Sequence, residues 1–306
     1  MPDTDYPFDL LWELLALDSP SGDESPLADW LEHWAARALP DARVERFGDT
    51  VLLRRGAKPS VAVFAHTDTT GWTLGYNSQL IPIGDPNGKI GDQVRPAGRP
   101  DNGNTLRRDT DGVWKLKGKT DSPPGSCWVY ADPAAQKSGE IQGPYLDNRC
   151  GVWAALTALQ HCAEICAAFT TGEEESGGGA MVSARHLYET HGITLALIAD
   201  LTWHTKHVKC GLGAAISLRD RSLPRRHYLS RVLTLAERSG RPFQREIESS
   251  GGSDGGAIER SGVPLDWVFV GAPEKAPHTA KERVRIADLQ SMAAMLVSLV
   301  DGLSRG

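Results

Sequence analysis

Apolar and polar residues follow two periodicities along the chain, and each periodicity predicts one type of element. Apolar residues at helical spacing predict a helix over residues 6–17. Turn and cap residues follow at 18–24, and a second helix is predicted after them, running through Leu27 and Trp34. The same spacing predicts helices over 150–166, 179–190, 227–239 and 284–303. Short apolar or β-branched runs predict strands within 42–55 and at 60–65, 166–171, 194–200, 208–218 and 265–271.

Residues 71–145 interrupt this pattern, because they combine many Gly, Pro, Asn and Asp residues with short strand-like pieces. Such a stretch is typical of a small module of hairpins and turns. Strands alternate with helices on both sides of it, which indicates a single α/β domain. We therefore expect a catalytic domain made of residues 1–70 and 146–306, interrupted by a β-rich insert at 71–145.

Composition excludes several classes of protein. The chain of 306 residues has 39 acidic and 33 basic side chains, a net charge of −6, and 40% hydrophobic residues. An acidic balance argues against nucleic-acid binding, and the apolar fraction is sufficient for a folded core. No stretch reaches the roughly 18–20 uncharged apolar residues of a membrane span. The acidic N-terminus lacks the positive start of a signal peptide, so we expect a cytoplasmic protein without membrane contact.

Five cysteines are present, an odd number without a CxxC pair: Cys127, Cys150, Cys162, Cys166 and Cys210. This pattern favours reduced, structural thiols over a disulfide framework. Cys162 and Cys166 are four residues apart on the helix predicted over 150–166, so their thiols could meet there.

Polar side chains of metal-binding type follow the predicted strands. In open α/β sheets, ligands bind at the carboxyl ends of the strands. Imidazole and carboxylate groups there suit a divalent transition metal, zinc first, with cobalt or manganese also possible. So many acids favour two neighbouring ions that activate a water. Each residue alone is more often part of a capped turn or a solvated helix start than of a metal site, and only the combination favours the site. The group comprises His66, Asp68, Asp147, Glu173, Glu174, Glu175, Asp200 and His278.

Short motifs occur in an ordered series: HTD at 66–68, GPYLDNRCG at 143–151, TTGEEESGGGA at 170–180, IAD at 198–200, GGSDGGAI at 251–258 and PHTAKE at 277–282. In these motifs the sequence resembles the dinuclear metallo-aminopeptidases of the glutamyl and deblocking aminopeptidase kind, some of which form tetrahedral shells. The resemblance implies a zinc-exopeptidase-like α/β fold, with a mixed sheet flanked by helices. It also implies that the insert mediates dimerisation, and therefore a homo-oligomer.

The resemblance implies a role for each matching residue. His66 and Asp200 would hold one metal, Glu174 and His278 the other, and Asp147 would bridge them. Asp68 would hydrogen-bond His66 and fix its tautomer. Glu173 would act as the general base. Asp254 would lie near the substrate pocket.

The chain departs from the family pattern at several positions. Thr69 replaces the Glu that usually follows HxD. The segment ESGGGA lacks the Arg that commonly precedes the final Gly-Ala in this family. Trp203, His204 and His207 follow Asp200 and either shape the pocket or lie on the surface. These departures concern substrate choice and assembly, since every ligand position is filled.

The function expected from these residues is the metal-dependent removal of N-terminal residues from peptides. Two alternatives remain: an amidohydrolase or deacylase acting on N-acyl amino acids with the same metals, and a non-catalytic, metal-stabilised scaffold. A phosphate-binding P-loop is excluded, because the Gly-rich segment at 172–180 lacks the GxxxxGK[ST] pattern and is acidic.

Overall fold

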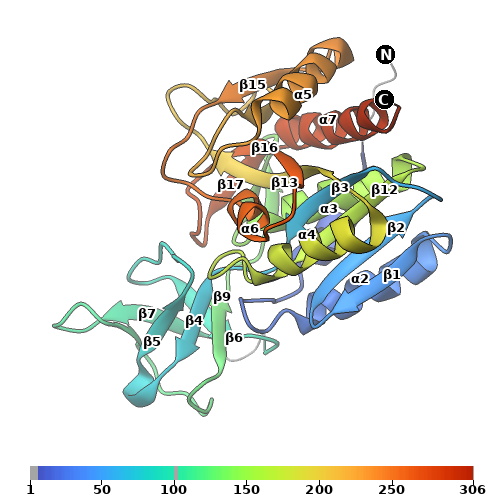
Figure 1. Ribbon diagram of the computed structural model, residues 1–306. Helices are drawn as coiled ribbons and strands as arrows, with labels where there is room; N and C mark the ends of the chain where they lie inside the picture. The colour runs from blue at the N-terminus through green and yellow to red at the C-terminus, as the bar shows by residue number, and fades with distance from the viewer. Residues whose placement is uncertain (1–5, 100–102, 306) are drawn as a thin grey trace.

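The computed structural model describes residues 6–99 and 103–305. Residues 1–5 and 306 of the expected catalytic domain, and 100–102 of the expected insert, lie outside the described residues. The chain forms a large lobe of helices around a central sheet and a smaller lobe of strands, shown in cyan and green at the lower left of Figure 1.

The central sheet has the order β1-β2-β12-β3-β13-β16-β17-β11-β10, with β14 and β15 branching from β16. Its four inner strands β12, β3, β13 and β16 are parallel, and the flanking strands are antiparallel. The inner strands are almost entirely buried because helices cover both faces. The strands are β1 (Arg43–Phe47), β2 (Thr50–Arg55), β3 (Val61–His66), β10 (Ala135–Lys137), β11 (Glu140–Gly143), β12 (Ile165–Thr170), β13 (Leu195–Trp203), β14 (Ala214–Ser217), β15 (Phe243–Glu246), β16 (Asp266–Lys275) and β17 (Glu282–Arg285).

Helices cover the two faces of the sheet unequally (Figure 1). One face packs against α1 (Asp9–Leu15), α2 (Ser25–Ala38), α3 (Leu146–His161), α5 (Arg226–Ser239) and α7 (Ile286–Ser304). Among the described helices, those on the other face are α4 (Gly178–His191) and α6 (Asp254–Arg260). This arrangement confirms the predicted fold class, a mixed sheet flanked by helices.

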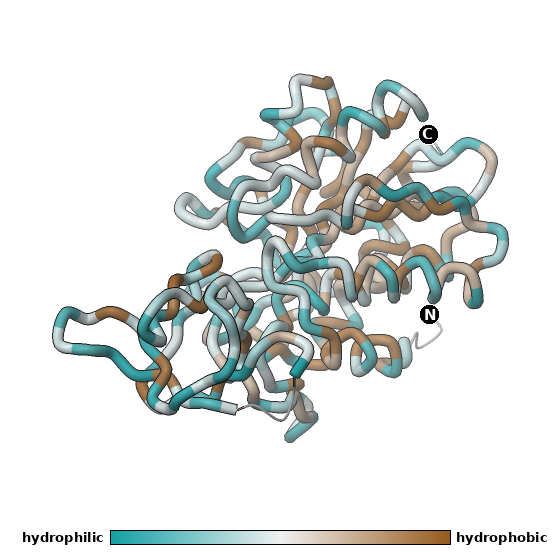
Figure 2. The backbone as a smooth tube through the Cα atoms, turned by 90° about the horizontal axis from the view of Figure 1, so that it is seen from below, coloured by the Kyte–Doolittle hydropathy of each residue, from teal (hydrophilic) through white to brown (hydrophobic). Residues whose placement is uncertain are grey.

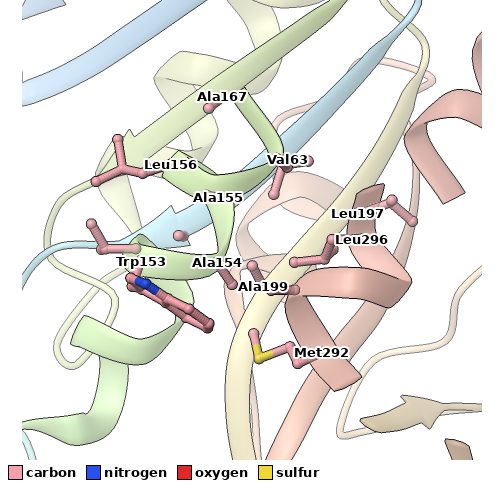
Figure 3. Close-up of a cluster of buried hydrophobic side chains, with 14 of the residues drawn as sticks. Val63, Trp153, Ala154, Ala155, Leu156, Ala167, Leu197, Ala199, Met292 and Leu296 are labelled. Carbon is pink, nitrogen blue, oxygen red and sulfur yellow. The ribbon is translucent and has the colours of Figure 1, made fainter. Parts of the chain in front are cut away.

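Strand alternation divides the apolar residues between the two faces. Val63 of β3 points into the larger cluster, whereas its neighbours Ala62 and Phe64 belong to the smaller one. In Figure 3, Trp153 and Leu156 of α3 lie in the larger cluster together with Met292 and Leu296 of α7, next to the strands. Burial from both sides explains why these strands appear as continuous apolar runs in the sequence.

Helix α7 contributes much of this core. Among the described helices it has the length and composition to cross a membrane, with a hydropathy of 1.4, but 61% of that window is buried. It contacts α3, α5 and β16. Its apolar character therefore matches that of a core helix.

The smaller lobe is a six-stranded sheet in the order β5-β4-β9-β6-β7-β8. It has its own core around Trp72, Trp128 and Leu106, and Figure 2 shows it projecting from the larger lobe. Its strands are β4 (Gly71–Leu74), β5 (Leu80–Ile83), β6 (Gln93–Pro96), β7 (Asn104–Arg108), β8 (Trp114–Leu116) and β9 (Cys127–Tyr130), with a short 3-10 turn at Tyr76–Ser78.

Strands β10 and β11 lie within the stretch assigned to the insert, yet they extend the central sheet through β17. The separate sheet therefore ends at Tyr130. Short polar strands carry no signal of which sheet they join, so the sequence did not reveal this boundary.

Several predicted elements have different ends in the structure. The helix predicted over 150–166 ends at His161, and Cys166 lies on β12. Cys162 and Cys166 therefore do not share a helix; they belong to clusters on opposite faces of the sheet, and all five cysteines are free. The strand predicted over 208–218 is confined to β14. Helix α6 was not predicted; it begins where the Ser253 hydroxyl accepts a hydrogen bond from the Gly255 N–H.

Candidate active site

The predicted site residues meet at the carboxyl edge of the parallel strands. His66 ends β3, Asp200 lies near the end of β13, and Glu173 and Glu174 follow β12. Asp147 lies in the first turn of α3, and His278 lies between β16 and β17. All of them line one cavity of about 590 Å³, which also includes Gly84 and Asp85 of the smaller lobe. The structure thus brings together residues that are up to 212 positions apart in the sequence, from His66 to His278 (278 − 66).

Asp147 is at the centre of this group. Its Oδ1 lies 3.2 Å from His66 Nε2, which is also 3.5 Å from Asp200 Oδ1. Its Oδ2 lies 3.6 Å from His278 Nε2, and Glu174 Oε2 lies 3.6 Å from the same nitrogen. The two oxygens of Asp147 therefore face two different sets of side chains, each with one histidine and one further carboxylate.

The charges of the site are unbalanced without a cation. Burial raises the pKa of Asp200 to about 7, although the charge of His66 lowers it. Burial likewise raises the pKa of Glu174 to about 8, although the charge of His278 lowers it. Within the described chain no lysine or arginine forms an ion pair with Asp147, Glu174 or Asp200. Neighbouring buried carboxylates disfavour ionisation of one another, and a divalent cation relieves this repulsion.

A buried oxygen points to the same chemistry. Asp147 Oδ1 is inaccessible to solvent and has no hydrogen-bond partner among the described residues, although His66 Nε2 is 3.2 Å away. The contact lacks hydrogen-bond alignment, so a lone pair of the carboxylate is unused. Imidazole nitrogens and carboxylate oxygens are the donors that zinc and related divalent metals prefer, so these residues fit such an ion.

Asp68 organises the loop that carries the acidic residues. Its carboxylate accepts hydrogen bonds from the Ser21 hydroxyl at 2.6 Å and from the backbone N–H groups of Glu173 and Glu174 at 3.0 and 3.1 Å. Its Oδ1 lies 3.6 Å from His66 Nδ1, beyond hydrogen-bond distance, while its backbone carbonyl is 3.2 Å from that nitrogen. The carboxylate therefore contacts the Glu173–Glu174 backbone more closely than the His66 ring.

Glu173 lines the cavity beside these groups. Burial raises its pKa well above the usual value, opposed by His66 and reinforced by the charges of Asp200 and Asp254. A carboxylate with raised proton affinity next to a reaction cavity suits general-base chemistry.

The smaller lobe positions His278 through one backbone carbonyl and one tyrosine hydroxyl. The Asp85 carbonyl accepts a hydrogen bond from His278 Nδ1 at 2.9 Å, and the Tyr130 hydroxyl donates to the His278 carbonyl at 3.0 Å. Glu175 accepts a hydrogen bond from the Gly84 N–H at 2.6 Å. Sequence reasoning missed these contacts, because the Asp85 carbonyl and the Gly84 N–H carry no residue-type signal and Tyr130 lies outside the motifs.

The remaining candidates differ in whether they line the cavity. Trp203 lines the cavity, whereas His204 and His207 are exposed and do not line it. Asp254 is buried just behind the lining, where its carboxylate accepts a hydrogen bond from the Thr170 hydroxyl at 2.6 Å.

Comparisons with known proteins find similar chains and similar folds. A protein from Acetivibrio thermocellus named as an aminopeptidase is 24% identical over 332 residues, covering 96% of this chain and 98% of the relative. The structure of an aminopeptidase from the archaeon Desulfurococcus kamchatkensis matches with a TM-score of 0.82 and 19% identity, over 95% of this chain and 93% of that one.

Two further solved structures share the fold. A TET aminopeptidase from a marine sediment Thaumarchaeota archaeon matches with a TM-score of 0.84, 17% identity and 96% coverage of both chains. A TET peptidase of Pyrococcus horikoshii, which can assemble into a tetrahedron or a large octahedral shell, matches with a TM-score of 0.79 and 19% identity, over 96% of this chain and 98% of that one. A family model described as M42 glutamyl aminopeptidase matches residues 123–295, more than half of the 306 residues, and the chain therefore belongs to the M42 glutamyl aminopeptidase family.

Proposed function

We propose that this protein is a two-metal aminopeptidase that removes N-terminal residues from peptides. The observation that carries the proposal is the position of Asp147, whose two carboxylate oxygens face His66 and His278 on opposite sides. One carboxylate between two separate sets of ligands suits two neighbouring divalent ions.

His66 and Asp200 would hold one ion, Glu174 and His278 the other, and Asp147 both. Zinc is the first choice for this donor set, with cobalt or manganese as alternatives. When bound, the ions supply Lewis-acid polarisation of the scissile carbonyl and lower the pKa of a water. The Asp85 carbonyl orients the imidazole of His278 by accepting from its Nδ1–H.

Glu173 carries the proton in this proposal. Its carboxylate takes a proton from the attacking water and delivers it to the amine that leaves. The raised proton affinity of the buried side chain favours the first transfer. Asp68 keeps the Glu173 backbone in place through the hydrogen bond from its N–H.

The cavity suits a substrate with a free α-amine. Besides the proposed ligands and Glu173, the described lining has two arginines, Arg221 and Arg260, and more acidic residues: Asp85, Glu175, Asp220, Glu246 and Glu248. A negative cavity concentrates a protonated amine near its carboxylates. This charge favours peptides with free N-termini over N-acyl amino acids.

We also propose that the chain self-associates through the smaller lobe. Three large apolar residues there are exposed to solvent: Tyr76 (80% exposed), Ile81 (49%) and Ile90 (71%). Large exposed apolar side chains are typical of interaction surfaces. The mass in solution from light scattering tests this, and a monomer at micromolar concentration contradicts it.

Activity assays on metal-loaded protein test the catalytic proposal. We expect hydrolysis of aminoacyl-anilides and of peptides with free N-termini, but not of the same peptides after N-acetylation. Glu173→Gln should retain both metal ions and lose at least about 10³-fold in kcat, because the proton acceptor is gone. Glu189→Gln, an exposed change on α4, is the matched control and should keep full activity.

Three results would overturn this function: preferential cleavage of N-acyl amino acids, full activity of the Glu173→Gln variant, or fewer than one metal ion per chain under replete conditions. The first outcome would identify a deacylase, and the last would remove the two-metal basis.

A further inference from the structure

A second group of metal-ligand side chains lies away from the active site, between the edge strand β1 and helix α4. It consists of Glu45 on β1 and of His186 and His191 on α4. None of the three lines the active-site cavity. Glu45 and Phe47 are two residues apart on β1 and both contact His186 on α4.

The ligand atoms of this group converge. Glu45 Oε2 lies 2.7 Å from His186 Nε2, and Glu45 Oε1 lies 3.0 Å from His191 Nε2. One ligand atom from each residue can be chosen so that all three lie within 4.8 Å of one another. Bonds of about 2.0–2.1 Å to a tetrahedral zinc ion separate neighbouring ligands by about 3.3 Å, so small rotations suffice to admit an ion.

The surroundings of the group favour a cation. His191 is the last residue of α4, where the partial negative charge of the helix C-terminus stabilises positive charge. The Thr190 hydroxyl lies 3.3 Å from His186 Nδ1, which leaves Nε2 to face the carboxylate. The Phe47 ring packs on the His186 ring at 4.7 Å and restricts its rotation.

The carboxylate is ready to act as a ligand. Burial alone would raise the pKa of Glu45, but the hydrogen bond from His186 and the charges of both histidines lower it. Arg54 forms a longer ion pair with the same carboxylate, with its Nε 3.9 Å from Glu45 Oε1, so a bound ion would share Glu45 with this guanidinium. The three side chains are 15–27% exposed, so an ion can reach them from solvent.

We propose that Glu45, His186 and His191 form a further divalent-metal site, of zinc type, that ties the edge strand β1 to the C-terminal end of α4. Two imidazoles and one carboxylate supply three protein ligands, and water completes the coordination. The competing arrangement is a purely hydrogen-bonded one, in which each imidazole donates its Nε2–H to a separate oxygen of Glu45.

Such an ion would connect the edge of the sheet to a helix that begins near the active site. Helix α4 begins at Gly178, shortly after Glu173–Glu175, and its 14 residues span about 20 Å to His191. A metal clamp at the far end would fix the helix against β1 and stabilise the folded state by an amount that rises with the logarithm of the ion concentration above Kd.

Anomalous diffraction at the zinc edge, combined with metal analysis of the full chain, tests the site. After loading with zinc and dialysis, we expect a peak between Glu45, His186 and His191, distinct from any peak at His66 and His278. The double variant His186→Gln/His191→Gln should lose one zinc per chain. His227→Gln is the matched control, because it removes an exposed imidazole that also pairs with an acid, Asp266.

A thermal-unfolding titration with zinc gives a second readout. Added zinc should raise the Tm of the metal-loaded parent and of His227→Gln, but not that of the double variant. Glu45→Gln, which retains both imidazoles, should weaken zinc binding at least about tenfold and covers the case in which the double variant does not fold. The proposal is overturned if no peak occurs at the cluster, or if the parent and the Glu45→Gln variant bind zinc with the same affinity. Because the active site gives its own peaks, this result is independent of the aminopeptidase proposal.

Discussion

Asp68→Asn isolates the contribution of one buried carboxylate to the active-site loop. Asp68 is fully buried and accepts three hydrogen bonds, two of them from the backbone N–H groups of Glu173 and Glu174. Asparagine keeps one acceptor oxygen but turns an NH₂ group toward the remaining donors. The change therefore removes the charge and leaves at least one buried N–H without an acceptor.

The magnitude follows from these contacts. A hydrogen bond to a charged group contributes about 1.5–3 kcal/mol, and an unsatisfied buried donor costs about 1–3 kcal/mol, so we expect a destabilisation of about 3 kcal/mol. At roughly 2–4 °C per kcal/mol for a large domain, the Tm should fall by roughly 6–12 °C. Displacement of Glu173 by even about 1 Å should lower kcat by about 10²-fold.

Thermal unfolding and steady-state hydrolysis of an aminoacyl-anilide, both on metal-loaded protein, measure the two effects. Ser21→Ala is the matched control, because it removes only the hydroxyl donor at 2.6 Å and should cost about 1 kcal/mol. The reasoning is refuted if Asp68→Asn matches the parent in both assays, or if Ser21→Ala lowers kcat as far as Asp68→Asn does.

Three further changes test other parts of the structure. Arg149→Met should lower the free energy of unfolding by about 3–5 kcal/mol in urea titrations, because the buried guanidinium donates to the Leu14, Thr67 and Leu17 carbonyls; a loss below about 1 kcal/mol would contradict this. Gly151→Ala should cost about 3 kcal/mol or more in the same assay, because its Cβ would lie 2.2 Å from the Ala199 carbonyl oxygen; an unchanged urea midpoint would count against that packing. Hydrogen bonds from the Ser250 N–H and its neighbours lower the pKa of Glu248 to about 2, so its stabilisation of the 248–251 loop is complete above pH 4.5 and disappears as the pH falls toward 2. The protection of the loop amides against exchange, relative to the intrinsic rate at each pH, should fall over this range in the parent but not change with pH in Glu248→Gln; equal protection in both proteins would exclude the linkage.

The sequence alone was sufficient for the fold class and for the type of chemistry. The continuous apolar run at 60–65 predicted a strand, and the structure has it as β3, buried on both faces at the centre of the sheet. His66, Asp200 and Glu174 each follow such a run, so their convergence follows from the rule that parallel strands share one carboxyl edge. Local patterns thus carry long-range information wherever the strands are parallel.

Ends of elements and membership of sheets were decided by tertiary structure. Cys162 and Cys166 continue a helical pattern in the sequence, but the chain leaves α3 after His161 because β12 must pair with β2 and β3. Strands β10 and β11 are short and partly polar, and only their pairing with β17 assigns them to the central sheet.

Two features of the sites were also beyond the sequence. The Asp85 carbonyl orients His278 through a backbone group, which leaves no trace in residue type. Glu45 is 141 residues from His186, so neither residue suggests a ligand until β1 and α4 pack together. The sequence by itself determined the strands, helices and polar residues at strand ends, because those depend on local periodicity. The tertiary structure alone decided which distant side chains and backbone groups meet, because that depends on how the elements pack.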